Sequence, residues 1–94
     1  MKIIWTINAR MKLREIREYI SQDSMQNAVV FLDFLVKQVQ LLEASPQTGR
    51  IVPEFNDKAI RELVIKKYRI VYRILETEIH ILTVFEGHKL LSFS

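Results

Sequence analysis

Basic side chains interrupt three apolar runs between residues 60 and 85 of this 94-residue chain. The basic residues are Arg61, Lys66, Lys67, Arg69 and Arg73, and His88 and Lys89 follow the last run. Guanidinium and ammonium groups bind phosphate oxygens and stabilise negative charge that develops in a transition state, and a histidine can donate a proton. The pattern therefore permits a site that binds or cleaves a phosphodiester without a metal.

Acidic residues in the same stretch provide a structural alternative. Opposite charges on a sheet pair across neighbouring strands or lie in solvent, and the candidate partners here are Glu62, Glu76, Glu78 and Glu86. A buried guanidinium or ammonium group needs a partner or water. So many basic residues in one sheet also predict a polar face that stays open to a ligand or a partner.

Residue counts exclude several kinds of chemistry. The chain has no cysteine, so it cannot form a disulfide or use a thiolate as a nucleophile or a metal ligand. Its two histidines are too few for a metal site, and its two glycines form neither a phosphate-binding loop nor a dinucleotide motif. No two carboxylates are marked as an acid and base pair. We therefore expect no metal and no cofactor.

The overall composition fits one small domain that spans residues 1–94. Hydrophobic residues make up 49% of the chain, and the formal net charge of +3 permits a polyanionic partner without requiring one. Charged residues interrupt the N-terminal segment, so it does not have the pattern of a signal peptide. No apolar run is long enough to span a bilayer. We expect a cytoplasmic protein that does not bind membranes.

The first part of the chain predicts a strand and a helix. Residues 2–5 are rich in β-formers, and Thr6 or Asn8 can cap the helix that follows. Apolar residues then recur every three or four positions from Ala9 to about residue 21, which is the period of a helix with one buried stripe. Another face of this helix is basic, and we interpret it as solvated surface. Its residues are Arg10, Arg14 and Arg17.

A second helix follows a short polar break at residues 22–24. Asp23 and Gln26 have the spacing of a capping box, and the helix is predicted to run to about Ala44. Extra apolar residues widen its buried stripe. They are Val29, Phe34, Val36 and Leu41. Because a long helix laid across a sheet is usually buried over a broad arc, we predict that they belong to the core, with contact to a partner as the alternative.

Three strands are predicted after an irregular connector at residues 45–58, which Pro46 and Gly49 begin by ending the second helix. The strands cover about residues 60–66, 68–75 and 79–85. Their short turns make neighbouring strands antiparallel. The element order β-α-α-β-β-β predicts an α+β fold in which an N-terminal helical hairpin packs on one face of an antiparallel sheet.

Four sequence motifs occur in order along this second part of the chain. They are Ser45-Pro46-x-x-Gly49-Arg50-x-x-Pro53-Glu54, Arg61-Glu62-Leu63, Tyr68-Arg69-Ile70-Val71-Tyr72-Arg73 and Ile79-x-Ile81-Leu82-x-Val84. With these motifs and the order of its elements, nearly the whole chain resembles the RelE/ParE superfamily of bacterial toxins. The connector and the Arg61-Glu62-Leu63 motif are closer to its ParE branch.

The resemblance implies the toxin component of a type II toxin–antitoxin system, with a cognate antitoxin protein that wraps the toxin and occupies its grooves. ParE-like members poison DNA gyrase, so a gyrase inhibitor is the leading expectation. RelE-like members cut messenger RNA on the ribosome without a metal, so an endoribonuclease is the runner-up. A third alternative is a degenerate member that keeps antitoxin binding but has lost toxicity.

The resemblance assigns catalytic roles to Arg69 and His88 only if the chain is a nuclease. Arg69 matches the arginine that contacts the scissile phosphate in RelE-like nucleases, and His88 would be the general acid. The remaining basic residues would bind substrate phosphate. They are Arg61, Lys66, Lys67, Arg73 and Lys89. Residues 86–89 read Glu-Gly-His-Lys where ParE-like chains often read His-Gly-Arg-Arg, and the C-terminal tyrosine of many RelE-like nucleases is missing.

Overall fold

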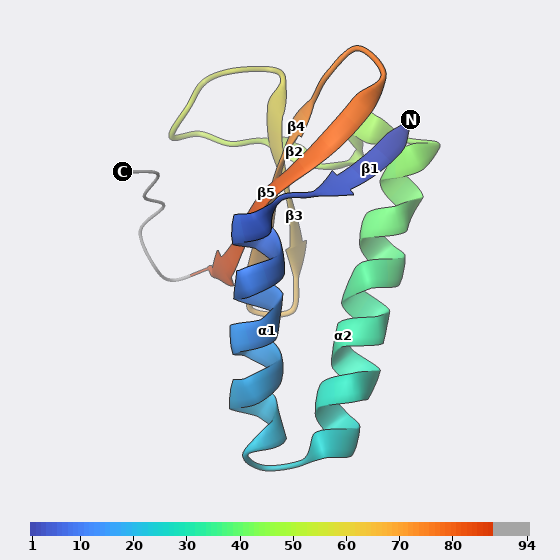
Figure 1. Ribbon diagram of the computed structural model, residues 1–94. Helices are drawn as coiled ribbons and strands as arrows, with labels where there is room; N and C mark the ends of the chain where they lie inside the picture. The colour runs from blue at the N-terminus through green and yellow to red at the C-terminus, as the bar shows by residue number, and fades with distance from the viewer. Residues whose placement is uncertain (88–94) are drawn as a thin grey trace.

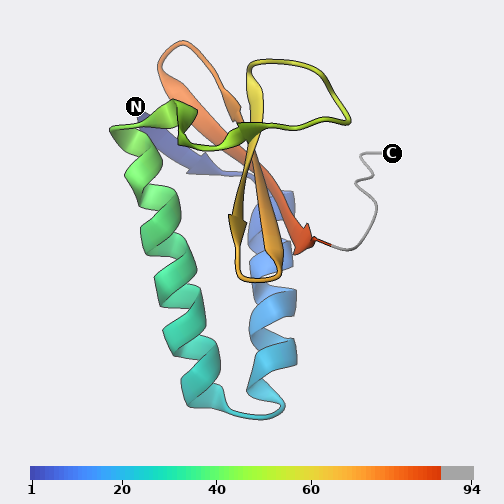
Figure 2. The same cartoon turned by 180° about the vertical axis from the view of Figure 1, so that it is seen from behind.

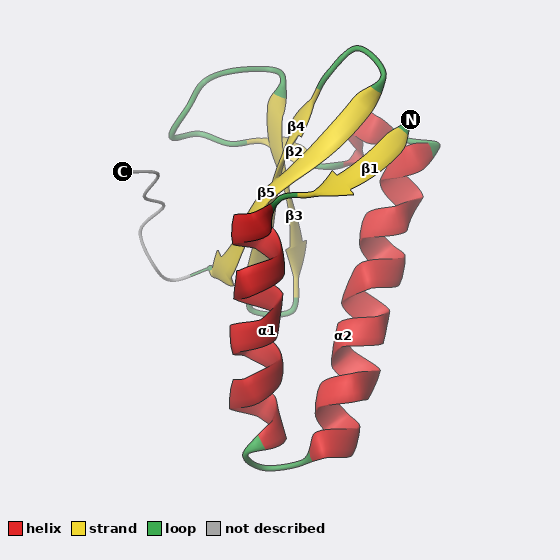
Figure 3. Cartoon of the chain, viewed as in Figure 1, coloured by secondary structure: helices red, strands yellow, loops and turns green. Residues whose placement is uncertain are grey.

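The computed structural model describes residues 1–87, which form two α-helices packed on a five-stranded sheet (Figure 1). The helices are α1 (Ile7–Ser21) and α2 (Met25–Gln40), followed by two 3₁₀ turns, η1 (Leu41–Glu43) and η2 (Pro46–Thr48). The strands are β1 (Lys2–Trp5), β2 (Arg50–Ile51), β3 (Ile60–Ile65), β4 (Tyr68–Ile74) and β5 (Glu78–Glu86). The predicted α+β fold with an N-terminal helical hairpin is confirmed (Figure 3).

Each helix is capped at its N-terminus by a hydroxyl side chain. The Thr6 hydroxyl accepts a hydrogen bond from the Ala9 N–H (3.1 Å), and the Ser24 hydroxyl accepts one from the Asn27 N–H (3.1 Å). Each bond satisfies one of the N–H groups that a helix leaves unpaired in its first turn. The predicted cap at Thr6 is confirmed. The predicted capping box at Asp23 is wrong, because the residue that caps α2 is its neighbour Ser24.

The outer surface of α2 is more apolar and more exposed than predicted. Val29 is 58% exposed, Phe34 42% and Leu41 63%, so the prediction that these residues belong to the core is wrong. Only the stripe that carries Leu35 and Val39 is fully buried against the rest of the fold. The helix also ends earlier than predicted, where the chain tightens into η1. A membrane-spanning helix is absent from residues 1–87.

The sheet is mixed, with the strand order β1-β5-β4-β3-β2. The last four strands pair antiparallel, but β1 is parallel to β5 and forms one edge. The Thr6 N–H and hydroxyl both donate to the Ile81 carbonyl (3.2 and 2.8 Å), which fixes the end of β1 along β5. The two-residue strand β2 lies outside the predicted elements, and it pairs Arg50 with Glu62 at the opposite edge.

The helices cover one face of the sheet, and the main core lies between these two layers (Figure 3). Its largest fully buried side chains are Tyr72, Leu35, Leu42, Ile70, Ile79 and Ile81. Burial of this much apolar surface is the dominant favourable term in folding. The packing of the helical hairpin on the sheet therefore fixes the position of the strands, including the residues that they present on the opposite face.

The other face of the sheet carries a second, smaller core. Val52, Ile60 and Val71 are buried there, with Leu82 and Phe85 packed against them. Val52 belongs to the connector between β2 and β3, which loops out beside the sheet in Figure 2. The sequence predicted a face that stays open, and this prediction is wrong for the part of the face that the connector covers.

A β-bulge in β5 shifts the alternation of its side chains between the two cores. Val71 pairs with Thr83 and Tyr72 pairs with Ile81, so Leu82 is an extra residue on β5. An extra residue reverses the alternation of side chains beyond it. Ile81 and Val84 consequently both face the main core although they are three residues apart, and Leu82 and Phe85 both face the smaller one.

Candidate functional site

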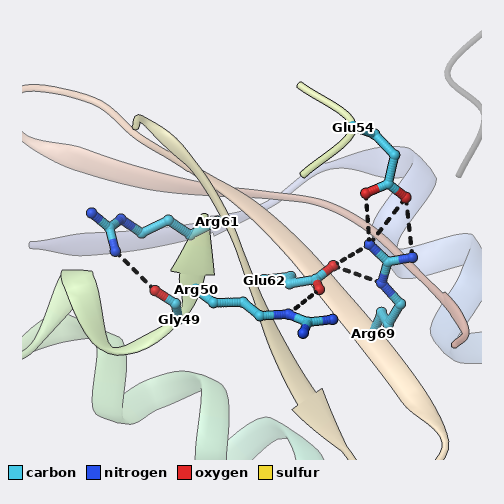
Figure 4. Close-up of polar contacts among 6 residues, drawn as sticks. All are labelled: Gly49, Arg50, Glu54, Arg61, Glu62 and Arg69. Atoms are coloured by element: carbon cyan, nitrogen blue, oxygen red, sulfur yellow. Dashed lines mark hydrogen bonds and ion pairs between the residues drawn. The ribbon is translucent and has the colours of Figure 1, made fainter. Parts of the chain in front are cut away.

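A buried carboxylate lies at the centre of the polar residues on the second face of the sheet. The Glu62 side chain on β3 is completely buried. Its Oε1 accepts a hydrogen bond from Arg69 Nε (2.6 Å), and its Oε2 accepts one from Arg50 Nε (2.6 Å), as Figure 4 shows. A buried carboxylate needs such partners, because an unpaired charge in the interior is costly. Glu62 therefore links the edge strand β2 to the central strand β4.

The Arg69 guanidinium also holds the connector. Its Nη1 and Nη2 atoms lie 3.2 to 3.3 Å from the Glu54 carboxylate, in a fork-like arrangement (Figure 4). Its Cζ atom lies 5.0 Å from the centroid of the Phe85 ring, within range of a cation–π interaction. The Arg69 side chain is only 10% exposed. Two carboxylates and an aromatic ring thus surround this guanidinium.

The pKa shifts within the network keep its charges in place. Burial acts to lower the pKa of Arg69, but hydrogen bonds to Glu54 and Glu62 outweigh that effect and raise it. The hydrogen bond from Arg69 lowers the pKa of Glu54, with help from the positive charges of Arg69 and Arg50. Glu54 and Arg69 are therefore both charged at neutral pH.

A second anchor fixes the beginning of the connector. The Tyr72 hydroxyl donates to the Pro46 carbonyl (2.7 Å) and accepts from the Gly49 N–H (2.9 Å). A Cβ atom on Gly49 would lie 2.5 Å from the Tyr72 hydroxyl oxygen and 2.6 Å from the Glu62 carbonyl oxygen. Real Cβ atoms do not approach other atoms so closely, so only glycine fits at this position. The connector is therefore held near its start by Tyr72 and farther along, at Glu54, by Arg69.

The predicted phosphate-binding residues do not converge on one point. Arg61 donates to the carbonyls of Gly49 (2.9 Å) and Gln47 (3.3 Å), so its guanidinium binds the backbone of the connector. The remaining predicted residues of the described chain lie near the two ends of β4. They are Lys66 and Lys67 in the exposed β3–β4 turn and Arg73, exposed near the other end. Lys67 and Arg73 are six positions apart in the sequence, which is about 20 Å along an extended strand.

The two lysines differ in their surroundings. Lys66 adopts a left-handed backbone conformation (φ 55°) in the tight turn. Lys67 Nζ lies 5.3 Å from the centroid of the Tyr19 ring and 5.6 Å from that of the Tyr68 ring. His88 and Lys89 lie outside the described residues. The catalytic and phosphate-binding roles assigned from the sequence stay predictions.

Three residues of the polar network around Arg69 are absent from the predicted site, namely Glu62, Arg50 and Glu54. Glu62 was a candidate partner for the basic residues, and its pairing with Arg69 is confirmed. Arg50 and Glu54 were noticed only as parts of the connector motif, although they occupy defined places in the site. Their signal in the sequence was their place in the connector motif, one and five positions after Gly49.

The fold is similar to that of a solved structure. A chain of the solved structure described as "Chromosomal ParDE TA system from P. aeruginosa" matches it with a TM-score of 0.77 at 24% sequence identity, over 92% of this chain and 95% of that chain. This likeness establishes the RelE/ParE-like fold. None of the curated proteins matches the chain.

The sequence comparison identifies the family. The family described as "ParE toxin of type II toxin-antitoxin system, parDE" matches residues 3–91, nearly the whole chain. The chain belongs to the ParE toxin family. This family is one half of a toxin–antitoxin system, so membership implies an antitoxin partner.

Proposed function

We propose that this protein is a toxin that binds and inhibits DNA gyrase and is neutralised by a cognate antitoxin. Membership of the ParE family supports the proposal, because the resemblance to ParE-like toxins implies action on gyrase. The structural observation that carries it is the enclosure of Arg69 between Glu62 and Glu54. In the RelE-like nucleases that the fold resembles, the matching arginine contacts the scissile phosphate.

The enclosure of Arg69 argues against cleavage of RNA by this chain. A guanidinium that binds a phosphate bidentately must present free N–H groups to it. The Nε, Nη1 and Nη2 atoms of Arg69 already bond to carboxylate oxygens. The lysines of the β3–β4 turn and Arg73 lie near opposite ends of β4, so they cannot hold one phosphate between them.

The exposed apolar surface of α2 supports a protein partner. Val30 (62% exposed) and Phe34 (42%) line an open groove of about 620 Å³, together with Phe31, Asn27 and Lys66. Apolar surface gathered in one place is typical of interaction sites. We assign this groove to the antitoxin, which would remove the apolar side chains from water.

Expression in cells tests the proposed function against its two alternatives. We expect induction of the toxin to stop growth and to relax a negatively supercoiled reporter plasmid, with intact messenger RNA. Expression of the antitoxin from the neighbouring reading frame should restore both growth and supercoiling. Messenger RNA cut at the ribosomal A site, with normal supercoiling, would instead establish an endoribonuclease. Normal growth with soluble toxin present would establish a member that has lost toxicity.

A further inference from the structure

A row of arginines lies along one side of the helical hairpin. Arg10, Arg14 and Arg17 are exposed on α1, and they line one open depression of about 340 Å³. Leu13 from α1 and Leu32 from α2 complete its lining. The depression therefore combines three cationic side chains with apolar side chains from both helices. We call it the arginine groove.

The charges of the arginine groove are not balanced within residues 1–87. None of the three arginines forms an ion pair or a side-chain hydrogen bond with another described residue, whereas other charged residues of the hairpin do. Lys12 lies 3.6 Å from Glu15, and Lys37 lies 3.0 Å from Asp33. Like charges three or four positions apart on a helix repel each other. The three arginines thus offer donors that are unpaired among the described residues to a partner.

We infer that the arginine groove binds an acidic, amphipathic segment of the cognate antitoxin. This inference rests on the proposed function, and it adds the chemistry of the partner segment. Carboxylates of the segment would pair with the arginines, and apolar side chains between them would cover Leu13 and Leu32. Leu13 and Leu32 are partly buried against the main core, and a nucleic acid backbone would match the row of charges but would leave the exposed parts of these leucines uncovered by apolar groups.

The apolar part of this surface continues along α2. Val29 and Val36 lie three residues before and four residues after Leu32, so they share its side of the helix. Val29 is 58% exposed and Val36 is half-buried. An apolar strip beside a basic row fits a partner helix that carries apolar residues on one side of its contact surface and acidic residues on the other.

The affinity of the purified toxin for its antitoxin, measured over a range of salt concentrations, tests this inference. We expect Arg14→Glu combined with Arg17→Glu to weaken binding at least tenfold near about 0.1 M salt and to flatten the salt dependence. Replacing the same two arginines by glutamine should give a smaller loss in the same direction. The matched control is Lys2→Glu combined with Lys58→Glu, two exposed residues outside the groove, and it should leave affinity nearly unchanged.

Inhibition of gyrase by the same variants separates this inference from the proposed function. The Arg14→Glu, Arg17→Glu toxin should still inhibit gyrase but should need at least tenfold more antitoxin for neutralisation. Unchanged antitoxin affinity would overturn the inference and leave the proposed function intact. Loss of gyrase inhibition with normal antitoxin affinity would show that the groove contacts the target instead. A wild-type toxin that does not bind the antitoxin would contradict both.

Discussion

Arg69 donates from Nε to Glu62 Oε1 across 2.6 Å, and both side chains are buried on the face of the sheet that the helices leave uncovered. The two residues are diagonal neighbours on β3 and β4, because Glu62 pairs with Val71 and Arg69 pairs with Val64. A buried ion pair of this kind is costly to break, since the remaining partner keeps its charge without compensation. Because Arg69 also binds Glu54, the pair fixes the connector to the central strand β4.

Replacement of Glu62 by glutamine should strongly destabilise the protein. The substitution keeps the shape of the side chain but leaves two arginines facing a neutral amide. Removal of one partner from a buried pair typically costs about 3–5 kcal/mol. Urea unfolding measures this difference in the free energy of unfolding. Asp33→Asn is the control, because it breaks an exposed pair with Lys37 and should cost less than about 1 kcal/mol. Equal small effects at both sites would contradict a structural role for Glu62.

Replacement by alanine should destabilise the protein at Gly49 but not at Gly87. Gly49→Ala would force a methyl group against Tyr72 and the Glu62 backbone, where overpacking costs about 3 kcal/mol. Gly87→Ala would bring its Cβ no closer than 3.4 Å to another residue, so it should change stability by less than about 0.5 kcal/mol. Thermal unfolding of both variants compares them directly. A Gly49→Ala protein as stable as Gly87→Ala would show that the connector does not pack as described.

Loss of the Tyr72 hydroxyl should loosen the start of the connector. Tyr72→Phe removes the partner of the Pro46 carbonyl and of the Gly49 N–H, at a cost of about 1–3 kcal/mol. Hydrogen exchange at the Gly49 amide should become faster. Tyr19→Phe is the matched control, because Tyr19 is 58% exposed, and it should leave this amide unchanged. Protection that survives in the Tyr72→Phe protein would mean that another group holds the amide.

The Glu54–Arg69 contact should make part of the stability depend on pH. The pKa of Glu54 is lowered in the folded protein from its ordinary value of 4.5, mainly by the hydrogen bond from Arg69. A lowered pKa adds stability that is present above pH 4.5 and is lost as the pH falls through the folded value. Because Glu54 is partly exposed, the gain is up to about 1 kcal/mol.

Comparison with Glu54→Gln measures this contribution. Wild type should be more stable than Glu54→Gln at pH 7, and the gap should close as the pH falls below 4.5. Urea unfolding at a series of pH values gives both curves. A gap that stays constant down to low pH would mean that the Glu54 carboxylate does not contribute through its charge.

The order of elements could be predicted from the sequence because hydrophobic period and turn residues are local signals. The period of Ala9, Leu13 and Ile16 defines α1 as the structure has it, and the alternation around Tyr72 defines β4. The parallel pairing of β1 with β5 depends on contacts between distant residues, such as Thr6 with Ile81, which leave no local pattern. Long-range pairing was therefore the part of the fold that the sequence left open.

The site was harder to predict than the fold. Arg69 was predicted as a site residue on the condition that the chain is a nuclease, and its pairing with Glu62 was among the structural alternatives, since the two lie on adjacent strands. The part played by Glu54 could not be derived, because it belongs to a connector of irregular structure whose path is fixed by Tyr72 and Val52. Charge patterns in strands thus predict partners on neighbouring strands but not partners that lie in a loop.

The most direct test of the account is a supercoiling assay with purified gyrase, relaxed plasmid and increasing amounts of the purified toxin. We predict that the toxin blocks supercoiling or traps cleaved DNA in proportion to its concentration, and that added antitoxin restores full activity. The Lys2→Glu, Lys58→Glu protein should inhibit as well as wild type. Full supercoiling in the presence of a large excess of folded toxin would contradict the proposed function.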